Sequence, residues 1–558
     1  MMNNRLVRAA LLLWLVSLAL HAHAESAAPE VVIGKRLFLE TRFAQAFFAQ
    51  CHGDVNATVA GDPALDQTVT AGSALPGAFA GKTMSCRVCH FEDEQQLAPG
   101  GGVRTYCDFA RRSPIPERND GKHSTVRNSP TLVAAALPRQ QFFLHFDGEF
   151  PTPEDLALGT FTGRNYGWLA SEHAAAVKHI ANVIRGDNGQ GELAQAYGGA
   201  YAKIFAADPS VPAQFLLPPA FRLDVARSPD AKVMSAAAKL IGAYLRSLDF
   251  SRDGAGNYNG SPYDLFLIKN NLPQKGNAGE SDRDYSRRLG AALNALAAPV
   301  FVTPADGSFS THAIPFVFGP DELAGMKLFF ADGAAGPAKP PPPPPSGAPG
   351  AAPLPPGGSG NCVTCHAAPN FTDFRFHNTG VSQLEYDAQH GDGAFFSLKI
   401  PSLAERTKSP TAALPASAIH PGYSGAFRSI PSPTDPALAD LGLWNVYANK
   451  DIPHPQKALK AQLQLVFGKL KDDALLDQTI ATFKTPGLRD LGHSQPYQHN
   501  GSLDNIQGVM QFYLQVSDMA RRGLIRNPDP QLAGIALNPT QAAQIAKFLN
   551  ALNEDFQD

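Results

Sequence analysis

The chain has 558 residues and a formal net charge of −3, and it is long enough for two or more domains. Hydrophobic residues make up 44% of it and charged residues 17%, a balance typical of a globular protein rather than of a disordered chain or a multi-spanning membrane protein. Channels and transporters are therefore excluded. Without a basic charge balance to attract phosphates, we expect no nucleic-acid partner.

Residues 1–24 have the pattern of a secretory signal peptide. Arg5 and Arg8 precede the apolar run Leu11–Leu20, and Ala22-His23-Ala24 forms an A-x-A cleavage site. The run is about half as long as a membrane-spanning helix, which favours a cleaved signal over an uncleaved anchor. We therefore predict a periplasmic protein with no membrane span after signal cleavage.

Cysteine spacing carries the clearest chemical signal. In Cys86-Arg87-Val88-Cys89-His90, the two thiols can join the vinyl groups of one haem as thioethers while the histidine ligates the iron. The pattern recurs as Cys362-Val363-Thr364-Cys365-His366. A redox disulfide or a zinc site is the alternative, but zinc fingers lack the adjacent Cys-His pair. We predict two covalently bound c-type haems, held by Cys86, Cys89, His90, Cys362, Cys365 and His366.

Two further cysteines, Cys51 and Cys107, lie on either side of the first motif. Cys51 has no cysteine three residues earlier, so Cys51-His52 is not a third haem attachment site. In an oxidising compartment these two cysteines form a disulfide or remain separate thiols, and the sequence does not decide between the two.

Apolar residues recur every three or four positions in four segments, which predicts amphipathic helices. These segments are residues 172–185, 235–248, 502–514 and 540–552. The alternation typical of strands is scarce. We therefore expect a mostly α fold, in which two cytochrome c-like haem domains have long loops and little strand.

The chain reads as two related halves. Gly34–Phe38 precedes the first haem motif, and the similar segment Gly325–Phe330 precedes the second. We predict an N-terminal haem domain over residues 25–310 and a C-terminal haem domain over residues 311–558. Residues 333–360 include six consecutive prolines, which predicts an exposed Pro/Gly-rich loop or, alternatively, a ligand for a proline-recognising partner.

Several segments resemble the bacterial dihaem cytochrome c peroxidase superfamily, which includes the MauG-type enzymes. Besides the haem motifs, these segments are Arg127–Leu132, Asn370–Asn378, Phe483–Arg489 and Pro496–Ser502. The likeness runs from about Gly34 to Leu552. It implies that the N-terminal haem reacts with hydrogen peroxide, that the C-terminal haem relays electrons, and that a calcium ion lies between them.

The resemblance implies that His90 is the proximal ligand of the reacting haem and His366 that of the relay haem. Classical members carry a methionine twelve residues after the glycine of a His-x-Gly-Ser block, and MauG-type members resemble this arrangement with a tyrosine. Counting twelve from Gly501 reaches Tyr513. A phenolate ligand lowers the potential of ferric iron more than a thioether does. Met510, near the same helix face, is the alternative ligand, and a core role for Tyr513 is the other alternative.

The resemblance also implies a calcium site. Its ligands would be the Asn128 side chain and the backbone carbonyls of Ser494 and Pro496. Such hard oxygen ligands suit calcium. The alternative is that Asn128 only caps a helix or turn.

Three departures from the peroxidase pattern concern catalysis. The inter-haem tryptophan of the family is Phe146 here, and the family's arginine after the Asp-Gly pair is replaced by Glu149. The position of the family's catalytic glutamate is Tyr166. Peroxide cleavage needs a group that moves a proton, and Glu154, Asp155 or Glu172 would serve only if the loop differs. The candidate catalytic-site residues are Phe146, Glu154, Tyr166 and Trp168, for which packing, capping or solvation is the alternative.

Classical members place a removable histidine on the face of the reacting haem opposite its proximal ligand. In this sequence only His123 falls in the corresponding interval, between the first haem motif and Arg127. A solvated loop histidine is the alternative, and we expect an open or water-bound face.

The sequence therefore predicts an exported dihaem oxidoreductase. Its partners would be hydrogen peroxide and either a periplasmic electron donor or an oxidisable substrate. A non-enzymatic dihaem electron-transfer cytochrome and a dihaem oxygenase are the alternatives. The missing glutamate shifts the expectation from classical peroxidase chemistry toward MauG-like or oxygenase chemistry.

Overall fold

The computed structural model describes residues 27–63, 69–70, 73–74, 82–90, 112–139, 143–332, 358–453 and 455–556. The predicted signal peptide, Cys107 and all but the last residues of the predicted Pro/Gly-rich loop lie outside these described residues. The expectations that concern them stay predictions.

Most of the regular structure is helical. The helices up to residue 247 are α2 (Pro29–Phe38), α3 (Gln45–Gln50), α4 (Cys86–Cys89), α5 (Pro153–Phe161), α6 (His173–Gly186), α7 (Glu192–Ala196), α8 (Tyr201–Ala206) and α9 (Asp230–Ser247). Those that follow are α10 (Pro262–Lys269), α11 (Asp282–Ala295), α12 (Pro320–Phe330), α13 (Val381–His390), α14 (Ala394–Ser397), α15 (Leu403–Lys408), α16 (Pro410–Ala413), α17 (Gln456–Phe467), α18 (Asp472–Gln478), α19 (Ile506–Arg521) and α20 (Pro539–Asn550). The four helices predicted from periodicity are α6, α9, α19 and α20, so these predictions are confirmed.

Short 3-10 helices and two small sheets complete the described elements. The 3-10 helices are η2 (Arg164–Tyr166), η3 (Ala170–Glu172), η4 (Ala213–Phe215), η5 (Pro219–Phe221), η6 (Cys362–Thr364), η7 (Leu443–Asn445), η8 (Leu491–His493) and η9 (Pro530–Gly534). Strand β1 (Val69–Thr70) pairs antiparallel with β2 (Ser73–Ala74), and β3 (Phe376–His377) with β4 (Phe483–Lys484). Phe376 lies opposite Lys484 in the second sheet. The predicted mostly α fold with little strand is confirmed.

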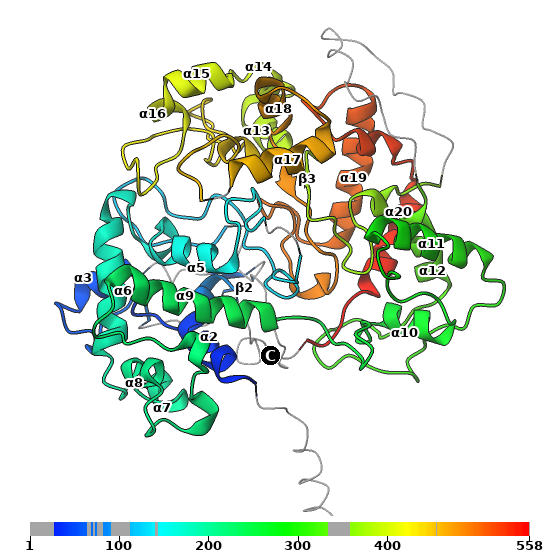
Figure 1. Ribbon diagram of the computed structural model, residues 1–558. Coiled ribbons are helices and arrows are strands. Elements are labelled where there is room, and N and C mark those ends of the chain that lie inside the picture. The colour runs from blue at the N-terminus through cyan, green and yellow to red at the C-terminus, as the bar shows by residue number, and fades with distance from the viewer. Residues whose placement is uncertain are drawn as a thin grey trace, which may run out of the picture.

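Each half contains the same close helix crossing. Helix α2 packs on α9 in the first half, and α12 packs on α20 in the second (Figure 1). A Cβ atom on Gly34 would meet the carbonyl oxygen of Leu240, and one on Gly325 would meet that of Gln544, both well inside 3.0 Å. Only glycine lets the two backbones approach this closely. The matching crossings support the interpretation of two related halves.

Buried residues of the described chain form three hydrophobic clusters. The first spans Ile33 to Tyr258 and includes Phe556, whose ring packs edge-on against Phe250. The second spans Tyr263 to Leu552. Residues 263–302, which the sequence places in the N-terminal domain, therefore pack in the second cluster.

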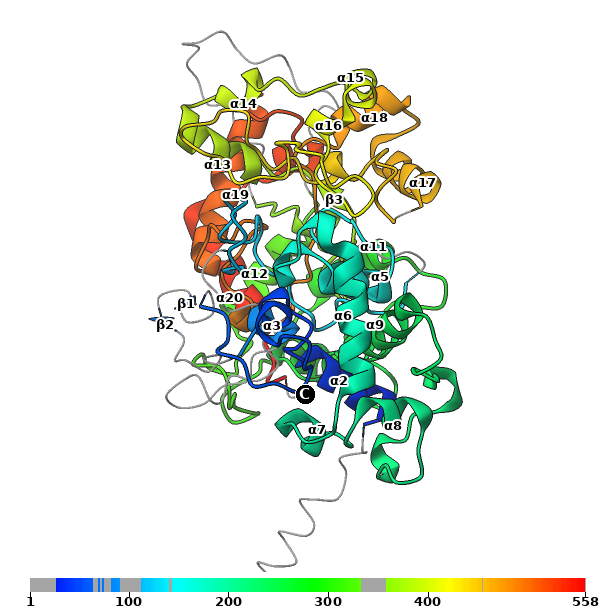
Figure 2. The same ribbon diagram turned by 90° about the vertical axis from the view of Figure 1, so that its left-hand side faces the viewer.

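The third cluster belongs to a segment that the sequence analysis did not separate. We refer to residues 381–481, which hold α13 to α18, as the cap segment. Its core surrounds the fully buried Trp444 and also takes in Phe143 from the first half. Figures 1 and 2 show these helices together at one end of the molecule, with α19 of the second half running up beside them. Within the described residues, we find no helix that combines the length and the hydropathy needed to cross a membrane.

Candidate haem sites and the loop between them

The second Cys-x-x-Cys-His motif lines a large cavity. Cys362, Cys365 and His366 lie on its wall, and its volume is about 260 Å³. Apolar side chains contribute much of the remaining wall, among them Phe329, Leu491, Ile506, Ile535, Ile545 and Leu549. A deep apolar cavity beside two thiols and an imidazole fits a covalently attached haem.

The ring of His366 is oriented for metal ligation. Its Nδ1 lies 2.9 Å from the carbonyl oxygen of Phe371, so Nδ1–H donates to that oxygen and Nε2 keeps its lone pair. Burial lowers the pKa of His366, which favours the neutral imidazole that binds metals. These features fit the predicted role of His366 as a haem ligand.

Both candidate second ligands reach this cavity from α19. Tyr513 and Met510 line it, three residues apart on one helix, and Met510 is buried. Burial, followed by the thiols of Cys365 and Cys362, raises the pKa of the Tyr513 phenol. Tyr513 therefore lies close to the thiols of the second motif, whereas the choice between the two ligands stays a prediction.

His377, to which the sequence analysis gave no role, is a largely but not fully buried histidine on the cavity wall, held between two carboxylates. Its Nδ1 lies 2.6 Å from Asp529 and its Nε2 lies 3.0 Å from Asp373. Burial opposes protonation, but the nearby Cys365 and Asp373 raise the pKa of His377 well above its ordinary value. Asp373, four residues before His377, is the one partner that the sequence could have indicated. Asp529 is distant in sequence and reaches His377 only in the folded chain.

Lys484 is the second cavity residue that sequence analysis missed. Burial, together with the neighbouring Arg139, lowers the pKa of its ammonium to about 7, while Asp147 acts to raise it. Its backbone N–H donates to the carbonyl of Phe146 at 2.7 Å. A partly buried lysine on the cavity wall fits an anionic group of a molecule bound in the cavity.

The first Cys-x-x-Cys-His motif lies in the core of the first half. Cys86–Cys89 is the short helix α4, and the hydroxyl of Tyr166 lies 3.2 Å from Cys86 Sγ. Burial, and then the neighbouring His145, lower the pKa of His90 to about 4. Its Nδ1 is buried and makes no hydrogen bond of ordinary geometry with the described residues, although the nearby carbonyl of Pro130 acts to raise the pKa. His90 is therefore a neutral imidazole able to bind a metal.

The remaining candidate catalytic residues lie in different surroundings. Tyr166 is buried beside the first motif, as described. Trp168 is also buried, and its indole N–H donates to the carbonyl of Phe43 at 3.1 Å within the first hydrophobic cluster. Glu154 lies on α5, where both of its carboxylate oxygens accept from Arg246 of α9 at 2.6 and 2.7 Å. The structure therefore brings Tyr166, but not Glu154, to the first motif.

Asn128, Ser494 and Pro496 line the same cavity, as the calcium prediction requires. The Asn128 Nδ2 donates to the Pro496 carbonyl oxygen. The Asn128 Oδ1 is buried and finds no hydrogen-bond partner among the described residues. An amide oxygen without a partner beside a carbonyl is an arrangement that a cation would complete.

Residues 145–149, which we call the bridging loop, lie between the two motifs. His145 is close enough to His90 to depress its pKa, and Phe146 lines the cavity of the second motif. The Phe146 ring centroid is 6.4 Å from that of His499, which stacks on Phe483 at 3.5 Å. This placement fits the inter-haem position that the resemblance implies for Phe146.

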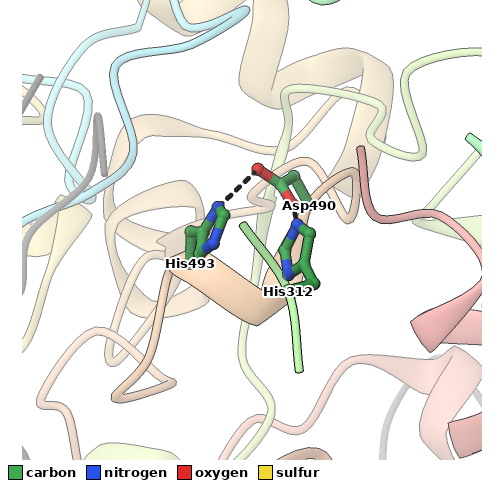
Figure 3. A group of neighbouring side chains, drawn as sticks. All are labelled: His312, Asp490 and His493. Atoms are coloured by element: carbon green, nitrogen blue, oxygen red, sulfur yellow. Dashed lines mark hydrogen bonds and ion pairs between the residues drawn. The ribbon is translucent and has the colours of Figure 1, made fainter. Parts of the chain in front are cut away.

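A separate cluster of two imidazoles and a carboxylate lies next to the cavity wall. In Figure 3, both His312 and His493 face Asp490, at 2.8 and 3.3 Å. The two rings stack face to face with centroids 3.9 Å apart, and each faces a different carboxylate oxygen. Lone pairs of stacked rings lie in parallel planes and do not converge on one ion, so the geometry is that of a hydrogen-bonded cluster rather than of a metal site.

His123 and Cys51 are the last residues singled out by sequence. The side chain of His123 is exposed, and Cys51 is buried. A distal-ligand role for His123 and a pairing of Cys51 stay predictions.

Two solved structures are similar over most of the chain. The diheme peroxidase BthA from Burkholderia thailandensis E264 has 16% identity and a TM-score of 0.43, and the match covers 94% of this chain and 86% of that one. A MauG-like protein associated with microbial copper homeostasis has 15% identity and a TM-score of 0.40, covering 94% of this chain and 90% of that one.

A curated protein is similar in sequence, whereas no family model matches the chain. The cytochrome-c peroxidase IdrP2 of Denitromonas iodatirespirans is 26% identical over 197 residues. The match covers 35% of this chain and 37% of that protein, so it spans little more than a third of the relative's length. This partial similarity to a cytochrome-c peroxidase agrees with the peroxidase resemblance that the sequence motifs carry.

Proposed function

We propose that the chain is an exported dihaem c-type oxidoreductase. The haem attached at Cys86 and Cys89 would react with hydrogen peroxide, and the haem attached at Cys362 and Cys365 would relay electrons. The electrons would come from a periplasmic donor or from an oxidisable substrate. Two bound irons would supply the one-electron redox chemistry that peroxide reduction requires.

The main support for this proposal is the arrangement of side chains around His366. A large cavity, two thiols and an imidazole with its Nδ1–H held by Phe371 together form a complete site for one c-type haem. The first motif has the same residues, and burial keeps His90 neutral. The partial similarity to a cytochrome-c peroxidase supports peroxide as the oxidant.

Different residues of the chain would bind the two irons and line the reacting pocket. His90 and His366 would orient their rings toward iron, and Tyr513 or Met510 would bind from α19. Tyr166, beside Cys86, would line the reacting pocket. Trp168 would support that pocket by packing, because its only polar side-chain atom already donates to the Phe43 carbonyl.

Glu154 would serve as a proton donor only after release from Arg246, because both of its oxygens are engaged. The ion pair also lowers the pKa of Glu154 against the opposing effect of burial. At neutral pH the carboxylate therefore holds no proton to donate. This supports slower peroxide cleavage than in enzymes with a catalytic glutamate near the iron.

A calcium ion would complete the junction between the halves. Asn128 comes from the first half, and Ser494 and Pro496 come from the second. The unpartnered Asn128 Oδ1 supports a cation there. Such an ion would hold the two halves in register, because its oxygen ligands would come from both of them.

The test is an optical and EPR titration of the purified, diferric protein with stoichiometric hydrogen peroxide. We expect the Soret band to shift or bleach, with slow turnover of small cytochrome donors. Mass spectrometry of the same sample gives the number of covalently bound haems. Fewer than two haems per chain would refute the dihaem assignment, and spectral inertness of both diferric and half-reduced forms would favour an electron-transfer cytochrome.

A further inference from the structure

The bridging loop is a tight turn that needs external support. Leu144 and Phe150 pair across it through two backbone hydrogen bonds, and Gly148 has a φ of +72°, which favours glycine. The loop places two acids, Asp147 and Glu149, two positions apart, and Asp147 is completely buried. Buried carboxylates destabilise a fold unless cations pair with them.

One of these cations comes from the same half. Arg127 Nη1 lies 2.6 Å from Asp147, and the rest of the Arg127 guanidinium binds Asp440 of the cap segment at 2.6 and 2.7 Å. Arg127 thus links the bridging loop to the cap segment. It makes no ion pair with Glu149 among those found in the described residues.

The other cation is Arg428, which belongs to the cap segment. Its Nη2 lies 2.7 Å from Asp147, and its two terminal nitrogens reach both oxygens of Glu149, one of them at 3.1 Å. Burial acts against ionisation of Glu149, but Arg428 and His145 hold its pKa far below the usual range. Arg428 therefore contacts both acids of the loop at once.

The neighbours of these two acids in the bridging loop face both haem sites. His145 Nδ1 lies 3.1 Å from Glu149, and His145 is the residue that influences His90. Phe146 precedes Asp147 directly and lines the cavity of the second motif. A shift of Asp147 or Glu149 would therefore move the side chains next to each motif.

We propose that Arg428 is a positioning residue for electron exchange between the two haem sites. Its ion pairs with Asp147 and Glu149 hold the bridging loop, so that His145 stays near His90 and Phe146 stays in the cavity of the second motif. The cap segment thereby has a role in the reaction although none of its residues lines the cavity of the second motif. This inference rests on the proposed dihaem function.

Exchange itself is a one-electron step: one electron leaves the reduced iron of one haem and reduces the ferric iron of the other, with no further reactant. The rate of such a step depends on the medium between the two groups. A displacement of about 1 Å costs up to about a hundredfold in rate when positioned groups are misplaced. Arg428 can therefore change the rate of electron exchange by changing the position of the bridging loop, although it belongs to the cap segment.

The experiment compares Arg428→Gln with Glu385→Gln in the full haem-loaded protein. Glu385 is the matched control, because it also joins the cap segment to the first half, through Arg112 at 2.6 Å, but does not contact the loop. Electron redistribution is followed in half-reduced protein after flash photolysis, and the EPR spectrum of the His90 haem is recorded in the oxidised protein. For Arg428→Gln we expect redistribution to slow by about tenfold, with an altered EPR signal. Glu385→Gln should match the parent protein.

A double variant covers the case in which Arg428→Gln does not fold. Glu149→Gln/Arg428→Gln removes both charges, so Glu149 no longer leaves an unpaired charge in the loop. It should fold and still show slower redistribution. Two bound haems by mass with parental redistribution and EPR in this variant would overturn the inference, whereas a parent protein without two haems would refute the proposed function instead.

Discussion

The two Cys-x-x-Cys-His motifs have the same chemistry but different surroundings. His366 has its Nδ1–H fixed by the Phe371 carbonyl and faces a cavity reached by Tyr513 and Met510. His90 has no hydrogen bond of ordinary geometry at Nδ1 within the described residues, and Tyr166 lies beside its motif. A fixed Nδ1–H makes an imidazole a stronger, better oriented ligand. The difference indicates that the spacing of a motif predicts where a haem would be attached, whereas the surrounding fold sets how its histidine is oriented.

The largest expected effect is the loss of one haem at a time. Cys362→Ala/Cys365→Ala should leave only the haem at His90, and Cys86→Ala/Cys89→Ala only the haem at His366, because thioether attachment needs the thiols. Intact-mass measurement of protein expressed with haem maturation factors gives the count. Retention of two covalent haems in either double variant would show that the motifs are not the attachment sites.

The helix crossings of the two halves should be about equally sensitive. Gly34→Ala and Gly325→Ala each force a methyl group into a backbone carbonyl, which should lower the free energy of unfolding by about 3 kcal/mol or more. Denaturant unfolding measures the effect, and Gly254→Ala is the control because a Cβ atom there would have no neighbour within 4 Å. If alanine at Gly34 or at Gly325 left the free energy of unfolding unchanged, the two halves would not have the same close helix crossing.

Buried carboxylates should give the two halves opposite pH dependence. Burial raises the pKa of Glu554, in the second half, to about 7, so the unfolded chain releases a proton near pH 4.5 that the folded chain keeps. Unfolding free energy should then fall as pH rises from about 4.5 to 7, by about 3 kcal/mol. Glu554→Gln should remove that fall and be more stable than the parent above pH 7.

The first half should behave in the reverse way. Burial opposes ionisation of Glu40, but Arg42 holds its pKa at about 2, so its stabilising effect is present above pH 4.5 and is lost as pH falls toward 2. Glu40→Gln should therefore be less stable than the parent at neutral pH, because Arg42 loses one of its two carboxylate partners and keeps only Asp187. Urea unfolding across pH 4 to 8 checks both variants, and parallel curves for Glu554→Gln and the parent would contradict this account.

The smallest expected effect is confined to one spectrum. Tyr513→Phe should change the spin state and potential of the haem at His366 and leave the spectrum of the haem at His90 intact. Met510→Leu, on the same helix, is the control. If only Met510→Leu perturbs the second haem, methionine is the ligand and the electronic difference between the two sites is smaller than we infer.

Local patterns in the sequence were enough to recognise the haem motifs and the family resemblance and to predict the amphipathic helices. Each depends on residues a few positions apart: the Cys-x-x-Cys-His spacing, or the apolar repeat that predicted α6, α9, α19 and α20. Helical hydrogen bonds and thioether geometry act over that same short range, so the chain order shows them directly.

Periodicity did not reveal the cap segment, because an apolar helix face does not say which core it joins. The same limit applies to residues 263–302, which pack in the second cluster rather than in the first. Hydrophobic burial is non-directional, so an apolar helix face has no preferred packing partner of its own. Which core it joins is decided only when the whole chain folds.

What the sequence determined by itself is the helical character of this protein, and it also predicts the covalent attachment of haem at the two motifs. The tertiary structure alone decided which charges meet: Asp529 joins His377 from 152 residues away, and Arg428 reaches Asp147 across 281 residues. Ion pairs between distant residues leave no trace in local composition, since their energy depends on distance and burial after folding. For that reason, the ion pairs that hold the bridging loop could not be predicted from the sequence.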